Sequence, residues 1–231
     1  MTNQNSSPQR LRNFYREIKF EMSEQMNTSF DLQAKTWDDD PMKTTRAQAV
    51  ALEIRAQVPL AAHMTALEYG CGTGLLSFAL HAQFKHITLA DSSSGMLDVL
   101  QEKITSGGIT NMRPLKLDLV TDPLPQERHD VVHSLMTLHH VSDIDAVLQG
   151  LYSLLAAPGY LCIADLDSED GSFHGPDFSG HKGFDRDALQ QQAMRAGFGN
   201  IRFTNAFTIR KSVAGGSEKD FPVFLMVAEK R

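Results

Sequence analysis

The stretch that most constrains the fold runs from Ala66 to Gly74, where a strand-like segment breaks into a turn with three closely spaced glycines. A helix-like run, residues 75–80, begins directly after it. Glycine has no Cβ and tolerates positive φ, so such a turn lets bare backbone approach a ligand. Asp91 ends the next apolar run about 20 residues on, a spacing that suits a carboxylate binding the hydroxyls of a ribose. The pattern predicts a site for a nucleoside-containing cofactor.

The composition bounds the class of protein. The 231 residues are 42% hydrophobic and 22% charged, which suits one large α/β domain with a substantial core. A net charge of -6 argues against a protein that grips long nucleic acid through its phosphates. Cys71 and Cys162 indicate neither a disulfide framework nor a zinc site. No run approaches a membrane span and the N-terminus lacks the apolar core of a secretion signal, so we expect no membrane partner and a cytoplasmic location.

Alternating strand-like and helix-like runs predict the architecture. The strand-like runs are residues 65–69, 86–90, 112–117, 130–135 and 159–165. The helix-like runs are residues 41–57, 74–84, 94–106, 143–156 and 185–196, with Asp40 and Asp185 as expected caps and Gly197 as a stop. This alternation implies a parallel sheet with helices on both faces. The last two runs, residues 200–210 and 221–229, are joined by a short turn and should pair antiparallel.

Two familiar nucleotide motifs fit the glycine turn poorly. A P-loop is excluded because Gly-Lys-Ser/Thr is absent at the required spacing. A dinucleotide fold favours G-x-G-x-x-G near the first strand of the chain. Here the glycines are spaced G-x-G-x-G, Leu75 and Leu76 follow, and two helices precede the turn, one of them predicted over residues 11–26.

The ordered motifs resemble those of the class I S-adenosylmethionine-dependent methyltransferases. Glu68-x-Gly70-x-Gly72-x-Gly74 is similar to the first motif of that superfamily, and residues 129–135 resemble its fourth-strand motif. The terminal hairpin matches its topological signature. The resemblance covers residues 43–230 and implies a Rossmann-like α/β fold: a seven-stranded, mostly parallel sheet with an antiparallel last strand, and a helical cap over residues 1–42 before a cofactor-binding domain over residues 43–231.

The resemblance also implies a cofactor, S-adenosyl-L-methionine, with S-adenosyl-L-homocysteine as its product, and a set of residues that bind it. These are Glu68, Gly70, Gly72, Gly74, Asp91, Ser92, Met96, Asp118, Ser134 and Leu135.

Each of these residues has an expected role. The backbone at Gly70 and Gly72 would approach the methionine portion. Glu68 would hold the ammonium group, directly or through water, and a backbone carbonyl near Ser134 or Leu135 would also contact it.

The nucleoside contacts follow in the same way. Asp91 would accept from the ribose, and Asp118 from the adenine amino group while its N–H donates to a ring nitrogen. Ser92 and Met96 would lie by the adenine. Alternatively Asp91 caps the following helix, Asp118 is an ordinary loop acid and Met96 is helix core. As a strand-end acid, Asp91 should contribute little to the fold.

The acceptor should lie above the carboxyl ends of the strands. His139 or His140, just after the fourth strand, could act as a base or an orienting group near neutral pH. Alternatively, one of them merely caps the next helix or packs beneath the loop. The glycine-rich loop after the fifth strand indicates a lid. Tyr15, Trp37, His174 and His181 are further candidates for acceptor contact. The acids and histidines of the loop after the fifth strand could bind a metal or a cationic acceptor, but their spacing fits no metal-site template, so no metal site is predicted.

Together these observations predict methyl transfer to an O, N or C nucleophile of a small-molecule partner by in-line displacement. Nucleic acid is not an expected partner. Three alternatives stay open: a transferase acting on tRNA or protein, one that uses a modified cofactor, and a non-catalytic S-adenosylmethionine-binding regulator. An NAD-dependent enzyme is a more distant alternative. The acceptor and the oligomeric state are not defined by the sequence.

Overall fold

The structure is a computed structural model that describes residues 28–231. The helix predicted over residues 11–26 and the acceptor candidate Tyr15 lie outside the described residues. Within them, no helix has the length and apolar character needed to cross a bilayer.

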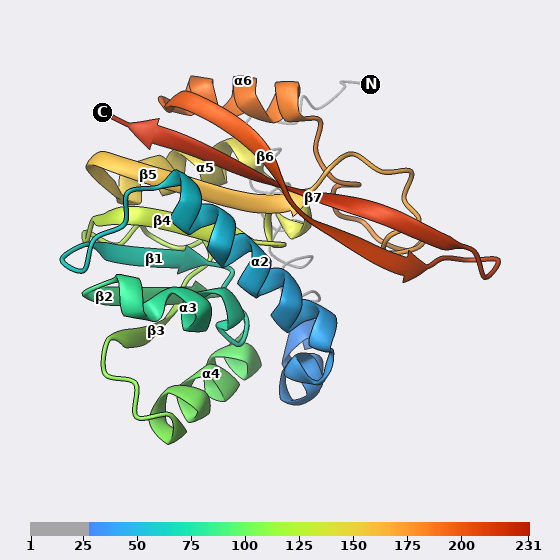
Figure 1. Ribbon diagram of the computed structural model, residues 1–231, viewed down its shortest axis with the longest axis horizontal. Helices are drawn as coiled ribbons and strands as arrows, with labels where there is room; N and C mark the ends of the chain where they lie inside the picture. Colours follow the sequence, from blue (N-terminus) through green and yellow to red (C-terminus); the bar gives the residue numbers. More distant parts are fainter. Residues whose placement is uncertain (1–27) are drawn as a thin grey trace, which may run out of the picture.

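A seven-stranded sheet forms the centre of the molecule (Figure 1). Its strands are β1 (Thr65–Tyr69), β2 (His86–Asp91), β3 (Met112–Lys116), β4 (His129–Leu135), β5 (Leu155–Leu166), β6 (Gly199–Ser212) and β7 (Glu218–Lys230). The order is β3-β2-β1-β4-β5-β7-β6. Neighbours among β1 to β5 pair parallel, whereas β7 runs antiparallel to both β5 and β6. The predicted α/β fold with an antiparallel last strand is confirmed.

Helices cover both faces of this sheet. They are α2 (Pro41–Gln57), α3 (Leu75–Leu80), α4 (Ser94–Ser106), α5 (Ile144–Leu154) and α6 (Arg186–Ala196), with 3-10 turns η1 (Ala34–Asp39), η2 (His81–Gln83) and η3 (Leu138–His140). The predicted caps are confirmed: the Asp40 side chain accepts from the Met42 amide and the Asp185 side chain from the Ala188 amide. Gly197 ends α6 with a φ of 107°.

Alternating strand residues divide the core into two layers. Ala66 packs in the layer beneath α2, α3 and α4, while the next residue, Leu67, packs in the layer beneath α5 and α6. Both side chains are fully buried. Because β1 is covered on both faces, its residues from Ala66 to Tyr69 are all buried rather than alternately buried and exposed. The carboxyl ends of β1, β2 and β4 therefore meet at one edge, between the two helical layers.

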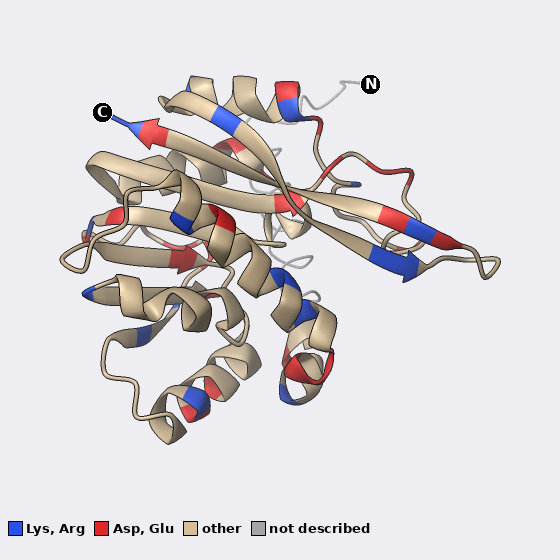
Figure 2. Ribbon diagram, viewed as in Figure 1, with Lys and Arg blue, Asp and Glu red and all other residues tan. Residues whose placement is uncertain are grey.

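The β6–β7 hairpin extends beyond the other strands (Figure 1). Its far end carries opposite charges on facing strands (Figure 2), where Arg210 pairs with Asp220 at 2.7 Å. Strand β5 begins at Leu155, four residues before the predicted start, because Leu155 already pairs with His129.

The buried layer under α5 gives a test of the core. Leu148 on α5 is fully buried, whereas Leu52 on α2 is 62% exposed. We expect Leu148→Ala to lower the free energy of unfolding by about 2–5 kcal/mol, since it leaves a cavity. Leu52→Ala should change it by less than about 0.5 kcal/mol. Urea unfolding of both variants measures the difference, and equal losses would contradict the assigned layers.

The first residue of β4 predicts a pH dependence. Burial lowers the pKa of His129 to about 4, and its side chain is 1% exposed. The unfolded chain takes up this proton near pH 6.5, well before the folded one, so stability is lost as the pH falls between those two values. His129→Asn should remove about 1–2 kcal/mol of the stability lost between about pH 7 and pH 5. His63→Asn, at an exposed histidine, should leave that loss unchanged in the same urea titrations.

Candidate functional site

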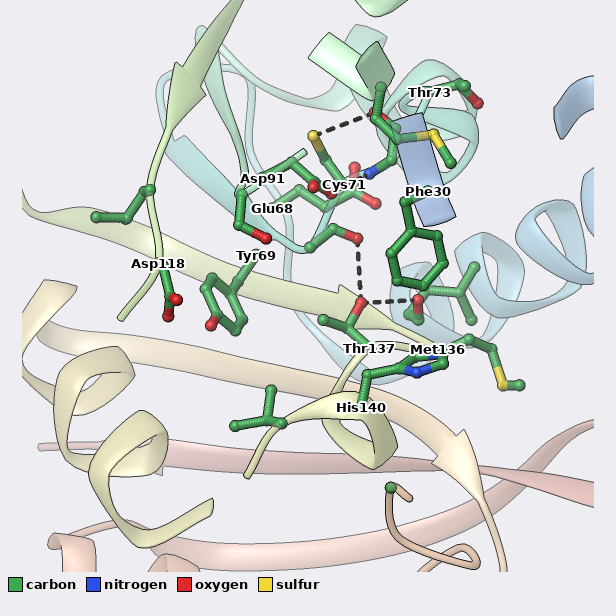
Figure 3. Close-up of a pocket in the computed structure, with 18 of the residues that line it drawn as sticks. Phe30, Glu68, Tyr69, Cys71, Thr73, Asp91, Asp118, Met136, Thr137 and His140 are labelled. Atoms are coloured by element: carbon green, nitrogen blue, oxygen red, sulfur yellow. Dashed lines mark hydrogen bonds between the residues drawn. The ribbon is translucent and has the colours of Figure 1, made fainter. Parts of the chain in front are cut away.

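A cavity of about 370 Å³ opens at the carboxyl ends of β1, β2 and β4. It lies where the order of the parallel strands reverses between β1 and β4, the usual ligand position in an open α/β sheet. Figure 3 shows Asp118 and Tyr69 towards one end, and Phe30, Met136 and His140 towards the other. The predicted cofactor residues that line it are Glu68, Gly70, Gly72, Asp91, Ser92, Met96, Asp118 and Leu135.

The glycine turn that follows β1 is held against β2. The amides of Gly70 and Cys71 donate to the Ala90 carbonyl at 2.8 and 3.0 Å. Gly70 and Gly72 have φ angles of 67° and 52°, which disfavour any residue with a Cβ. A Cβ on Gly70 would lie 2.1 Å from Thr137, whereas one on Gly72 would meet nothing closer than 3.9 Å. Both glycines line the cavity, but only at Gly72 would a side chain point into open space.

Two predicted contacts lie outside the cavity lining and support the turn instead. Gly74 begins α3 with a φ of 84°, and a Cβ there would lie 2.7 Å from Leu100. The buried Ser134 hydroxyl donates to the Tyr69 carbonyl at 2.8 Å, which ties β4 to β1. The next residue, Leu135, lines the cavity in place of Ser134.

Asp91 fixes the turn as well as facing the cavity. Its Oδ2 accepts from the Gly72 amide at 2.7 Å and its Oδ1 from the Ser93 amide at 2.8 Å. Burial raises the pKa of Asp91, and these two amide donors oppose that rise. Ser93, rather than Asp91, caps α4 through the Met96 amide. The expectation that Asp91 contributes little to the fold is therefore wrong, because its carboxylate joins β2 to the glycine turn.

The carboxylate of Glu68 is turned towards α3. Its Oε2 accepts from the Ser77 amide at 3.1 Å and from the Ser77 hydroxyl, and it lies 3.7 Å from His133 Nε2. Glu68 is 2% exposed although it borders the cavity. These partners hold the first turn of α3 on β1. All of them contact Oε2, so Oε1 is the oxygen that an ammonium group could reach without competing with them.

Asp118 lies in a tight loop at the same end of the cavity as Tyr69. Its Oδ1 accepts from the Val120 amide at 2.9 Å, and its own amide donates to Asp122 Oδ2 at 2.8 Å. The N–H expected to serve an adenine ring nitrogen is thus already bonded to Asp122. Met96 is 2% exposed and also lines the cavity, so it is helix core and cavity wall at once.

Aromatic rings line the opposite end of the cavity. Phe30 packs edge-on against Trp37, with ring centroids 5.8 Å apart, and against His140 at 5.2 Å. Trp37 and His181, two of the candidates for acceptor contact, line the cavity. His181 is held in place because its Nε2 bonds to the Val141 carbonyl at 3.0 Å.

The two adjacent histidines after β4 have different positions. His140 lines the cavity, whereas His139 is buried beneath it with its Nδ1 2.6 Å from Asp165 Oδ1. Burial, then the neighbouring His139 and His174, lower the pKa of His140 to about 3. Burial likewise lowers the pKa of His174, which lies outside the cavity lining, to about 4. A neutral imidazole of such low basicity suits orientation or ligation better than the role of a base near neutral pH.

Two cationic side chains of α2, Lys43 and Arg46, also line the cavity. The sequence did not predict either of them as a site residue. Lys43 Nζ lies 3.4 Å from the centroid of the Trp37 ring and bonds to the Trp37 carbonyl at 3.2 Å. The Nε of Arg46 is buried and has no hydrogen-bond partner among residues 28–231. Burial lowers the pKa of both side chains. An anionic group in the cavity would be stabilised by them. In the sequence, the spacing of Lys43 and Arg46 is that of an ordinary solvent-exposed helix face. No sequence signal therefore marks them as cavity residues.

Comparisons with known proteins agree with this geometry. Residues 66–159 match a family described as a methyltransferase domain. An uncharacterised methyltransferase of Schizosaccharomyces pombe is 32% identical over 167 residues, which are 65% of this chain and 57% of that protein. A ubiquinone biosynthesis O-methyltransferase of Marinobacter nauticus is 31% identical over 110 residues, which are 47% of this chain and 46% of that protein.

A solved structure shares the fold. Phosphoethanolamine N-methyltransferase 2 of Haemonchus contortus, in complex with S-adenosyl-L-methionine, superposes with a TM-score of 0.63 at 16% identity, over 79% of this chain and 52% of that one. This chain spans about half the length of the curated relatives it matches. The resemblance to class I S-adenosylmethionine-dependent methyltransferases is confirmed by the matched domain and by the sheet topology.

The glycine turn gives a paired test. Gly72→Ala adds a methyl group that points into open cavity, so we expect at least tenfold weaker S-adenosylhomocysteine binding, with a stability cost limited to the strain of its positive φ. Gly70→Ala drives its methyl group into Thr137 and should cost more stability than Gly72→Ala. Calorimetric titration and thermal melting separate the two effects, and identical behaviour of the variants would contradict the assigned orientation.

Proposed function

We propose that this chain transfers a methyl group from S-adenosylmethionine to a small-molecule acceptor. One observation carries the proposal: a single cavity joins the predicted nucleoside acids, Asp91 and Asp118, to an aromatic wall formed by Phe30, Trp37 and His140. The first end suits a cofactor with a ribose and an adenine. The second suits the molecule that receives the methyl group.

The chain's own residues would bind the cofactor along the edge of the sheet. Asp118 would accept from the adenine amino group, and the free lone pairs of the Asp91 carboxylate would accept from the ribose hydroxyls. The backbone at Gly72 leaves room for the methionine portion, and Arg46 supplies a buried positive charge for a carboxylate. A bound S-adenosylmethionine supplies an electrophilic methyl group on a sulfonium.

The acceptor end would contribute alignment and the exclusion of water. Transfer from a sulfonium needs the nucleophile, the methyl carbon and the sulfur in line, and little else from the protein. Phe30 and Trp37 cover this end of the cavity, while Thr137 is fixed by its hydroxyl bond to the Gly70 carbonyl at 3.0 Å. A concave site with an aromatic wall at this end favours a small acceptor over a macromolecule. The similarity to an enzyme named for ubiquinone biosynthesis favours the same class of acceptor.

Turnover distinguishes this proposal from its alternatives. We expect S-adenosylhomocysteine to form when the purified chain meets S-adenosylmethionine and a panel of phenols, thiols, carboxylic acids and amines. Turnover with tRNA or protein alone would favour a macromolecular acceptor. Binding of the cofactor without turnover on any nucleophile would favour a regulator. Thermal stabilisation by NAD but not by S-adenosylhomocysteine would overturn the cofactor assignment.

The ribose contact has its own test. Asp91→Asn keeps one side-chain oxygen, enough for the Gly72 amide, but its NH2 group cannot accept from the Ser93 amide, and the charged acceptor for the ribose hydroxyls is lost. Thermal melting of the variant shows how much stability the lost Ser93 bond costs. We expect S-adenosylhomocysteine to bind about tenfold to a hundredfold more weakly, since a hydrogen bond to a charged group contributes about 1.5–3 kcal/mol. Asp98→Asn, at an exposed acid on α4, serves as the control. Unchanged affinity in Asp91→Asn, measured by calorimetry, would remove the ribose assignment.

A further inference from the structure

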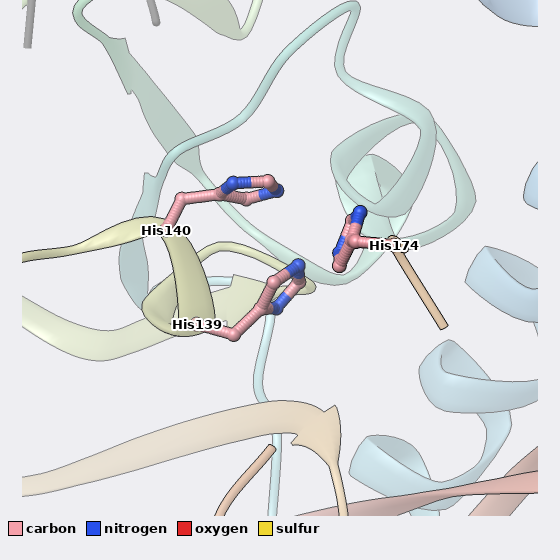
Figure 4. Close-up of side chains that lie close together, drawn as sticks. All are labelled: His139, His140 and His174. Carbon is pink, nitrogen blue, oxygen red and sulfur yellow. The ribbon is translucent and has the colours of Figure 1, made fainter. Parts of the chain in front are cut away.

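Three histidines from two distant segments converge beside the acceptor end of the cavity. His139 and His140 come from η3, directly after β4, and His174 comes from the loop after β5. One ring nitrogen from each lies within 4.8 Å of the others. Figure 4 shows the three rings facing a common space. The sequence predicts no metal here because the third histidine is 34 residues away and only the fold brings it to the other two.

A carboxylate behind the cluster orients one of these rings. Asp165, at the end of β5, is fully buried, and its Oδ1 lies 2.6 Å from His139 Nδ1. Its Oδ2 also accepts from the His139 amide at 3.3 Å. A proton held on Nδ1 leaves the lone pair on Nε2 free. Histidines that ligate metal ions usually donate their second ring N–H to a carboxylate in this way.

The arrangement of the other rings also suits an ion better than direct hydrogen bonding. Within residues 28–231 no hydrogen bond joins the three imidazoles, although their centroids are only 4.2 to 5.3 Å apart. A tetrahedral ion with ligands at 2.0–2.1 Å requires nitrogens about 3.4 Å apart. Small side-chain rotations would close that gap. His174 lies in a surface loop between Gly171 and Gly175, and its ring stacks on Phe178 with centroids 4.0 Å apart.

We propose that His139, His140 and His174 bind a divalent transition-metal ion of the zinc type, and that its open coordination position takes the nucleophilic atom of the acceptor. Three histidines with a fourth position left open are the ligand set of catalytic rather than structural zinc. His140 is the member of the set that lines the cavity, together with Gly180 and His181 of the loop that carries His174. The open position would therefore face the acceptor end. This role rests on the proposed methyl transfer; the metal site itself does not.

The ion favours a hydroxyl or a thiol as the acceptor group. Coordination lowers the pKa of such a group, and its proton passes to solvent water. A lone pair on the bound oxygen or sulfur then forms the new bond to the methyl carbon. The bond from that carbon to the sulfonium breaks, and its electron pair stays on sulfur. The products are a methyl ether or thioether and neutral-sulfur S-adenosylhomocysteine.

Metal binding can be measured without any turnover. The full chain, free of a histidine tag, is titrated with Zn²⁺ by calorimetry and with Co²⁺ by visible absorption. We expect one ion per chain and an intense band of tetrahedral Co²⁺. His174→Gln, at an exposed loop position, should weaken binding at least tenfold, whereas His63→Gln, at an exposed histidine before β1, should not change it.

Asp165→Asn tests the positioning carboxylate. The variant should bind Zn²⁺ about 10- to 100-fold more weakly, since the second ring nitrogen of His139 loses its charged partner. Thermal melting of each variant shows whether it is folded. Less than one ion per wild-type chain, or equal affinity in wild type and His174→Gln, would overturn the proposal.

The same samples separate this inference from the proposed function. S-adenosylhomocysteine affinity should be unaltered in His174→Gln, because His174 lies outside the cavity lining. A chain that binds S-adenosylhomocysteine but no metal keeps the methyl-transfer proposal and loses the metal site. If the chain binds the metal but neither S-adenosylhomocysteine nor S-adenosylmethionine, the metal site is kept and the methyl-transfer proposal is lost.

Discussion

The hydrogen bond from the Gly72 amide to the Asp91 carboxylate holds the candidate site together. It joins the turn after β1 to the end of β2 at 2.7 Å, beside the two amides that donate to the Ala90 carbonyl. With the turn fixed in this way, Gly70 packs against Thr137 and Gly72 opens onto the cavity. The cavity, the start of α3 and the approach to β4 all depend on that geometry. A carboxylate that fixes a loop can also bind a ligand without reorganising, which is how preorganised sites gain affinity.

Some of the motif residues face the cavity. Others hold those cavity-facing residues in place. Glu68 fastens α3 through Ser77, and Ser134 fastens β4 to β1. A motif that resembles a ligand-binding signature thus also encodes the local scaffold. The physical reason is that parallel strands converge at their carboxyl ends, so each polar group there is within reach of several backbone donors and acceptors.

Local chemistry explains why much of the fold could be predicted. Asp40 before Pro41, and Asp185 before a helix that ends at Gly197, are signals contained within a few residues, and the structure confirms them. The side chains that line the cavity could not be predicted in this way. Lys43 and Arg46 resemble the solvated face of a helix until α2 is placed over the end of the sheet. Side-chain burial there depends on what packs opposite, and no window of sequence contains that information.

The sequence by itself determined the order of the strands and helices, the glycine turn and the acid that follows it, because periodicity, capping and spacing are local properties. Only the tertiary structure decided what the histidines contact. His139 and His140 are neighbours, yet the tight turn of η3 directs one onto buried Asp165 and the other into the cavity. His174 joins them because the loop after β5 folds back across the carboxyl edge of the sheet, a contact that depends on the packing of the whole chain.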